Sequence, residues 1–330
     1  MERSLTNQSI LITGANGGMG FETTQLLYQQ GAGSIIMATR TQSKGDEAKA
    51  RLLASNPAQS TIVEAVGGFD MNDPRAIEEA VAKLPKQHPF DVVFLQAGGV
   101  VFGNERQTVN WNGLNVERTI SQNALGGYAT LVNLLKRGLI AEDATIVFAG
   151  GEGARGIPGL IPKPEFSGPD EFRNYVVKGD NLPAYHAMAA MGTSKLSSAI
   201  LSSKLAEIAE KTGFAGRVLW FTPGLTYGTN GLATTPPIQR FFMEKVAFGI
   251  MGLLGLAQSP KAGAQKFVDS LTGKIGRNGD IIGAPEGKAL GKLTNQKPMN
   301  AALTDPALRE TFWQIVQEAY APFPVEFAHV

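Results

Sequence analysis

Six short runs of mostly apolar residues, separated by longer helical stretches, constrain the fold of this chain more than any other feature. Each run is apolar almost throughout and rich in β-branched residues, which is typical of strands whose sheet is covered by helices on both faces. The predicted strands are residues 9–13, 34–39, 61–66, 91–96, 144–149 and 217–222. The predicted helices are residues 18–31, 44–55, 74–83, 107–138 and 184–213. This alternation predicts the α/β class, with a doubly wound parallel sheet.

The composition fits a single domain with one sizeable core. The chain has 330 residues, of which 43% are hydrophobic, so we predict one domain over residues 1–330. Two stretches break the alternation. One is an irregular insertion over 152–183, which holds five prolines, and the other is a segment over 226–260 that is loop-like and then apolar. Both follow strands at the edge where such sheets bind ligands, so we expect a substrate-covering C-terminal lobe in which 226–260 is the lid.

The composition also excludes several classes of protein and site. Because there is no cysteine and the histidines (His88, His186 and His329) show no ligand spacing, no disulfide and no metal site are expected. The formal net charge is +1 with acids and bases mixed, which argues against a nucleic-acid partner. The apolar run 246–257 is shorter than the roughly 20 residues of a transmembrane span, so it is interpreted as a buried or lid helix, with a shallow membrane contact as the alternative. The N-terminus lacks a signal-peptide pattern, so a cytoplasmic location is expected.

A glycine-rich turn follows the first predicted strand, in the sequence ILITGANGGMGFETTQLL. Its glycines allow a tight turn, and the amides at the start of the next helix face a pyrophosphate with the positive end of the helix dipole. An ordinary tight turn is the alternative. The position inside a strand–helix–strand unit favours dinucleotide binding. The predicted cofactor-binding residues of this turn are Gly14, Asn16, Gly18, Met19 and Gly20.

The end of the second predicted strand bears on the choice between NAD and NADP. An acidic residue at this position would bind the ribose 2′-hydroxyl of NAD, but the sequence has Arg40, with Ser43 and Lys44 close behind. A guanidinium and an ammonium suit the additional 2′-phosphate of NADP(H). A solvated arginine at a strand end is the alternative interpretation.

These motifs resemble the short-chain dehydrogenase/reductase family, nearest to its retinol-dehydrogenase and protochlorophyllide-reductase-like branch. The segments TGANGGMGFET, IMATRTQSKG, FDMND, LQAGGV, SQNALGGYATLVNLL and FTPGLTYGTN carry the likeness, which covers nearly the whole chain apart from 152–183. The resemblance implies a Rossmann fold, NADP(H) as cofactor and a small-molecule substrate, and it leaves a homo-oligomer open. It adds these cofactor-binding residues: Asp70, Met71, Ala97, Gly98, Asn123, Lys195, Pro223 and Gly224.

The chain departs from this family at the site of the chemistry. In the family, a tyrosine four residues before the lysine exchanges a proton with the substrate oxygen, a serine steadies the carbonyl, and the asparagine holds a water. Lys195 and Asn123 are present, but Met191 occupies the tyrosine position and Gly151, next to Gly150, occupies the serine position. A thioether has no proton to donate. The resemblance thus implies a catalytic site of Lys195, Asn123, Met191 and Gly151 with a non-standard proton donor.

Other side chains are candidates for that donor. On a regular helix over 184–213, Tyr185 and His186 would project away from the face of Lys195. Glu152, Tyr175 and Tyr227 lie on predicted loops near strand ends, where each is equally an ordinary loop or packing residue.

The sequence leaves three functions open. The first is an NADP(H)-dependent oxidoreductase of atypical mechanism that acts on a large apolar or conjugated small molecule. The second is a non-redox enzyme, an isomerase, cyclase or lyase, that uses the nucleotide as a scaffold. The third is a catalytically silent nucleotide-binding protein. The fold alone does not separate them.

Overall fold

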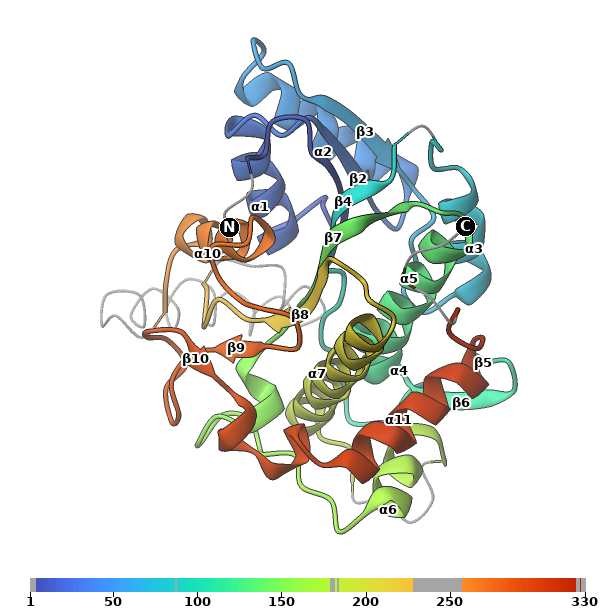
Figure 1. The fold of residues 1–330 in the computed structure, drawn as a ribbon. Coiled ribbons are helices and arrows are strands. Elements are labelled where there is room, and N and C mark those ends of the chain that lie inside the picture. Colours follow the sequence, from blue (N-terminus) through green and yellow to red (C-terminus); the bar gives the residue numbers. More distant parts are fainter. Residues whose placement is uncertain are drawn as a thin grey trace.

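One sheet organises the molecule (Figure 1). The computed structural model describes residues 4–86, 88–178, 182, 184–227, 257–324 and 327. Its 8-stranded sheet has the order β10-β9-β8-β7-β4-β1-β2-β3, and only the β9–β10 pair is antiparallel. The strands are β1 (Ser9–Thr13), β2 (Ser34–Ala38), β3 (Ile62–Val66), β4 (Phe90–Leu95), β7 (Ile140–Ala149), β8 (Arg217–Phe221), β9 (Ile281–Gly283) and β10 (Thr294–Asn295). The predicted doubly wound α/β fold is confirmed.

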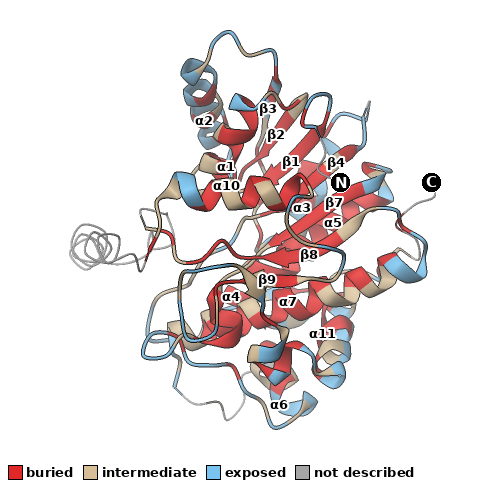
Figure 2. Cartoon of the chain, turned by 60° about the vertical axis from the view of Figure 1, so that its left-hand side comes forward, coloured by how far each residue is buried: buried red, intermediate tan, exposed pale blue. Residues whose placement is uncertain are grey.

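Helices cover both faces of the sheet because its strands are apolar on both faces (Figure 2). Ile10 and Ile12 of β1 pack toward one layer, and Leu11 between them packs toward the other, as the two-residue period of a strand requires. The first layer holds α1 (Gly18–Gln29), α2 (Gln42–Ser55) and α10 (Pro260–Leu271). The second layer holds α3 (Pro74–Ala82), α5 (Gly126–Lys136), α7 (Ala187–Lys211) and α11 (Pro306–Ala319). Asp73 caps α3 through its side chain, which accepts from the backbone N–H groups of Arg75 and Ala76.

The predicted helix over 107–138 is wrong in its first part. Residues Thr108–Trp111 and Leu114–Glu117 form an antiparallel hairpin, β5–β6. Its turn is Asn112-Gly113, and both residues have positive φ, 48° and 93°, as a type I′ turn requires. The chain then becomes helical through α4 (Arg118–Ile120), a π-helical turn η1 (Ser121–Leu125) and α5. The Asn-Gly pair between two short alternating runs is a strong hairpin signal.

The two irregular segments differ in what the structure describes. The stretch predicted as an insertion over 152–183 contains the 3-10 turn η2 (Glu152–Arg155), α6 (Pro169–Arg173) and the π-helical turn η3 (Asn174–Lys178), so it is less irregular than expected. Of the predicted lid over 226–260, residues 228–256 lie outside the described residues. The described ends of that segment meet beside β8, where Tyr227 N donates to Gln258 O at 3.1 Å. In the part of the chain that the structure describes, no helix has the length and apolar character needed to cross a membrane.

The C-terminal helix α11 covers the layer formed by α5 and α7 (Figure 1). Tyr128 of α5 meets Trp313 of α11 edge to face, with ring centroids 5.9 Å apart. The Tyr128 hydroxyl also donates to the Ala321 carbonyl at 2.8 Å. Asn133 donates to the Tyr320 hydroxyl at 2.6 Å, so the chain end is held by polar as well as aromatic contacts.

Candidate active site

The glycine-rich turn lies at the point where the strand order reverses, between β1 and β4. Gly14 follows β1 with φ 71° and donates its N–H to the Ala38 carbonyl at 2.9 Å. Gly18 begins α1 with φ 50°. A Cβ at Gly20 would lie 2.2 Å from the Gly14 carbonyl oxygen, so the turn closes only without a side chain there. The backbone at the start of α1 therefore remains bare, which fits the close approach of a pyrophosphate.

The end of β4 supports this turn from the neighbouring strand. Thr13 Oγ1 accepts from the backbone N–H groups of Gln96 and Ala97, at 2.9 and 3.0 Å. Oriented with its amide nitrogen toward the turn, Gln96 donates to the Gly14 and Thr13 carbonyls at 3.2 and 3.3 Å. Gln96 thus ties β4 to the glycine turn.

The predicted adenosine end lies at the ends of β2 and β3. Arg40 and Lys44 are exposed, and neither side chain has a hydrogen bond or ion pair to a described residue. Asp70 Oδ1 accepts from Asn72 N at 3.0 Å, which fixes the turn after β3. Met71 packs so closely on α5 that a Cβ at Gly126 would lie 2.6 Å from the Met71 Cβ. Two cations without a partner among the described residues therefore stand at the edge of the site.

Asn123 connects β4, α4 and α7 from within the π-helical turn η1. Its amide nitrogen donates to the carbonyls of Gly99 and Thr119, at 2.7 and 2.8 Å, and to Ser194 Oγ at 3.3 Å. Its oxygen accepts from Gly99 N at 3.1 Å. A Cβ at Gly98 would lie 2.2 Å from this oxygen, so that glycine is needed for the contact. Asn123 therefore links these three segments through its side-chain hydrogen bonds.

Lys195, Gly151 and Met191 come together where β7 ends against α7. The Lys195 ammonium donates to the Ala149 carbonyl at 3.1 Å. Its aliphatic stem crosses Gly151, where a Cβ would lie 3.3 Å from Lys195 Cε. Met191 precedes Lys195 by four residues, on the same face of the helix, and is partly exposed. No hydroxyl is supplied by position 191 or 151.

The carboxyl group of Glu152 is buried at the same strand end, with 6% of the residue exposed. Its oxygens accept from Thr222 Oγ1 at 3.0 and 3.1 Å, and one also accepts from Ala284 N at 3.3 Å. Burial raises the pKa of Glu152, against the opposing effects of these hydrogen bonds and of the Arg155 charge. Burial also lowers the pKa of Lys195 to about 8, and the Glu152 carboxylate acts against that shift. The charge of Glu152 therefore influences the protonation of Lys195.

The Pro223-Gly224 turn after β8 completes this edge. Gly224 has φ 92°, a conformation that favours glycine. The Pro223 carbonyl accepts from Gln258 Nε2 at 2.7 Å and from the Lys266 ammonium at 3.0 Å. Burial lowers the pKa of Lys266, and the charge of Glu152 raises it. Lys266 lies on α10, and its local sequence did not predict that it would contact the turn after β8.

The other candidate proton donors lie outside α7 or already contact other residues. Helix α7 begins at Ala187, so Tyr185 is not on it, and His186 is its N-cap and accepts from Ala189 N. The expectation that the helix included both was wrong by three residues. The Tyr185 hydroxyl donates to the Val101 carbonyl at 2.8 Å. The Tyr175 ring stacks under the Arg106 guanidinium at 4.3 Å.

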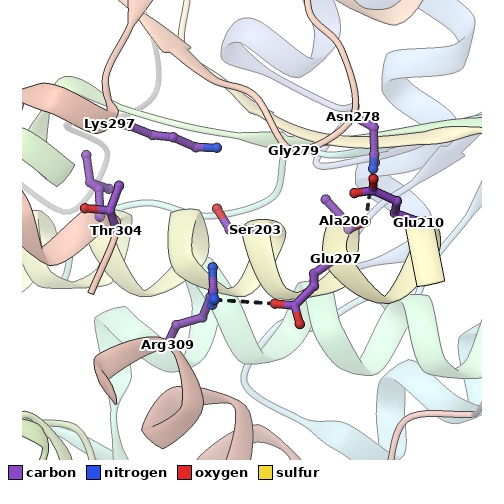
Figure 3. Close-up of a pocket in the computed structure, with 10 residues that line it drawn as sticks. Ser203, Ala206, Glu207, Glu210, Asn278, Gly279, Lys297, Thr304 and Arg309 are labelled. Carbon is purple, nitrogen blue, oxygen red and sulfur yellow. Dashed lines mark hydrogen bonds and ion pairs between the residues drawn. The ribbon is translucent and has the colours of Figure 1, made fainter. Parts of the chain in front are cut away.

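Two hollows accompany these residues. The larger, about 640 Å³, lies between the loop of residues 155–163 and Glu286, with His186 at its wall. The smaller, about 250 Å³, lies on the outer side of α7, where Glu210 lies near Asn278 and Glu207 is directed toward Arg309 (Figure 3). Arg309 pairs with Glu207 there at 3.4 Å. Only the larger hollow borders the segment that follows Glu152.

The sequence over β1 to η2 matches one known family. Residues 8–158 match the description "short chain dehydrogenase". Over these residues the chain is similar to short chain dehydrogenases. The match covers the glycine turn, the ends of β2 and β4, Asn123 and the Gly151 position, and it stops before Lys195.

Relatives are similar to this chain over part of its length. A short chain dehydrogenase of Gibberella zeae is 33% identical over 131 residues, which is 39% of this chain and 36% of the relative. A WW domain-containing oxidoreductase of Gallus gallus is 30% identical over 207 residues, 62% of this chain and 45% of that protein. The chain therefore spans less than half the length of these relatives.

The likeness of the fold extends to a solved structure. L-sorbose reductase from Gluconobacter frateurii, complexed with NADPH and L-sorbose, superimposes with a TM-score of 0.61. The superposition covers 88% of this chain and 100% of that chain, at 15% identity. At this identity the likeness shows the fold, which reaches well beyond residue 158.

Proposed function

We propose that this protein is an NADP(H)-dependent oxidoreductase of the short chain dehydrogenase type, acting on a large apolar or conjugated small molecule. The observation that carries the proposal is the division of the site. The glycine turn, Asn123 and Lys195 lie at the strand ends where a nucleotide would bind, while Met191 and Gly151 offer no group that exchanges protons. The retinol-dehydrogenase-like branch remains our assignment on sequence motifs.

The residues present fit a nicotinamide dinucleotide. In the proposed complex, the bare amides after Gly14 hold the pyrophosphate, Asp70 and Met71 flank the adenine, and Pro223-Gly224 faces the nicotinamide. Asn16, Met19, Ala97 and Gly98 line the path between them. When bound, the cofactor supplies or accepts a hydride. Lys195 holds the nicotinamide ribose.

Arg40 and Lys44 are the basis for proposing NADP(H) over NAD(H). Both are exposed cations without partners among the described residues, at the strand end that faces the adenosine ribose in this fold. A planar guanidinium binds phosphate through two parallel hydrogen bonds. The similar L-sorbose reductase structure holds NADPH. These observations together favour a 2′-phosphate.

The substrate class follows from what positions 191 and 151 offer. A thioether and a hydrogen atom make this part of the site apolar and wide, which suits a bulky, electron-poor double bond more than a small polar sugar. We propose that the segments 152–183 and 226–260 cover this substrate within one domain. Hydride transfer requires mainly that cofactor and acceptor are held in contact with water excluded.

The experiment measures NADPH and NADH binding by fluorescence and then NADPH consumption with a panel of conjugated enones and aldehydes. We expect tighter binding of NADPH, and faster consumption with bulky enones than with small saturated aldehydes. Isomerisation of an acceptor without NADPH consumption would favour the non-redox enzyme. Binding without any turnover would favour the silent protein, and either result contradicts the proposal.

A further inference from the structure

The ammonium of Lys195 is only partly engaged by the described residues. It can donate three hydrogen bonds, and its one hydrogen bond to a described residue goes to the Ala149 carbonyl at 3.1 Å. Gly151 leaves the space in which the stem of Lys195 lies, since a Cβ there would already be 3.3 Å from Cε. Met191 lies one turn earlier on the same helix face, so the ammonium of Lys195 places a transferable proton next to the position of the thioether.

Glu152 directly follows Gly151, over which the stem of Lys195 lies, and its carboxyl group forms no ion pair with a described residue. Both oxygens accept neutral hydrogen bonds, from Thr222 and Ala284, and no described cation lies within ion-pair distance of the carboxylate. Arg155, on the same 3-10 turn, instead donates to Gln296 Oε1 at 2.6 Å and to the Pro285 carbonyl at 3.0 Å. A buried carboxylate with neutral partners acts on the charges around it.

We propose that Lys195 is the proton donor of this site and that Glu152 is a positioning residue that keeps the Lys195 ammonium charged. This inference rests on the proposed function, because a proton donor is needed only if hydride transfer occurs. In this proposal Lys195 donates a proton to the substrate as well as binding the cofactor. Position 191 carries no phenol that would donate the proton instead.

The acid–base properties agree with this assignment. Burial lowers the pKa of Lys195 to about 8, close to neutrality, where a general acid is most effective. The Glu152 carboxylate opposes that shift. The charged groups that face Glu152 are Arg155 on η2, Lys195 on α7 and Lys266 on α10. The Lys266 ammonium donates to the Pro223 carbonyl at 3.0 Å. Of these three cations, Lys195 is the one that shares a helix face with Met191.

The proposed reaction is a two-electron reduction of the acceptor. The β-carbon of a conjugated enone, or the carbonyl carbon of an aldehyde, accepts a hydride from the reduced nicotinamide, so a C–H bond forms and the π bond breaks. The released electron pair on the α-carbon or the oxygen takes a proton from the Lys195 ammonium, whose N–H bond breaks. The neutral amine then regains a proton from water. The acceptor gains two electrons and two hydrogens, and the nicotinamide is oxidised.

Substitution of Lys195 separates proton donation from cofactor binding. Lys195→Arg keeps a positive charge that does not titrate, so NADPH should still bind while consumption with the best enone of the panel falls about 100-fold or more. Lys195→Met should lose binding as well. A Lys195→Arg protein that keeps both binding and rate contradicts the inference alone. If the parent protein consumes no NADPH with any acceptor, the proposed function fails, and the donor role fails with it.

A second measurement needs no turnover and tests Glu152. The dissociation constant of NADPH, measured against pH, should rise through a midpoint near pH 8 as Lys195 loses its proton. Glu152→Gln should move that midpoint to lower pH, and Glu152→Asp should largely restore it. Glu210→Gln, an equal charge change on the outer side of α7, should leave it in place (Figure 3). An unmoved midpoint in Glu152→Gln contradicts the positioning role, and if that variant does not fold, Glu152→Asp and Lys195→Arg decide.

Discussion

Gly150 and Gly151 are adjacent, but only Gly150 is required to be glycine by its neighbours. A Cβ at Gly150 would lie 2.7 Å from two ring carbons of Trp220, whose Nε1 donates to Ser198 Oγ at 2.9 Å. That ring is buried, so no side chain fits at 150 without repacking the core. At Gly151 the nearest atoms belong to the flexible stem of Lys195. A side chain there is sterically tolerable but displaces the lysine.

This difference leads to a prediction for the residues of the site. Met191→Tyr combined with Gly151→Ser should not create a general carbonyl reductase, because the new hydroxymethyl group at position 151 displaces Lys195 and the phenol fills the apolar space. NADPH consumption with the best native acceptor should fall about tenfold or more, as expected for misplaced reacting groups. Met191→Leu, which keeps the apolar volume, is the matched control and should stay active. Efficient turnover of simple aldehydes by the double variant would contradict the account.

At the scale of elements, the end of β2 and the start of α2 should decide cofactor choice. Arg40→Asp should weaken NADPH binding about 10- to 100-fold, since a hydrogen bond to a charged group contributes about 1.5–3 kcal/mol. NADH binding should change little or improve, because a carboxylate can accept from the ribose hydroxyls. Arg75→Asp reverses an exposed charge on α3 and serves as the control in the same titrations. An equal loss of affinity for NADPH and NADH would mean that Arg40 does not bind the 2′-phosphate.

The elements also show which parts of the structure the sequence could predict. The parallel strands were predictable because each is a short apolar run, and their residues alternate between two buried layers. The hairpin at 108–117 was missed because its two strands are only four residues long each and lead directly into a long helical run. The glycine turn and Lys195 were predicted as cofactor-binding residues because they lie in recognisable sequence motifs. The partners of Glu152 did not, because Thr222 and Ala284 are far along the chain and only the parallel pairing of β7, β8 and β9 brings them together.

At the scale of the whole molecule, stability should depend on how α11 seals the second helix layer. Trp313 is 9% exposed and contacts the rings of Tyr128 and Phe323, at 5.9 and 5.7 Å between centroids. Trp313→Ala should lower the free energy of unfolding by about 3–5 kcal/mol, the usual cost of removing a large buried aromatic side chain. Urea denaturation measures it. Gln314→Ala, on the exposed side of the same helix, should stay within about 0.5 kcal/mol of the parent. Equal effects of the two changes would mean that α11 contributes little to the fold.

The central claim is that this chain transfers a hydride although no phenol stands at position 191. The most direct test supplies NADPH that carries deuterium at the reactive face of the nicotinamide C4, together with the best conjugated acceptor of the panel. Mass spectrometry and NMR of the product locate the label. The account predicts one deuterium on the β-carbon and an unlabelled hydrogen on the α-carbon, delivered from an exchangeable site. Product without deuterium, or bound NADPH that never loses its label, would contradict it.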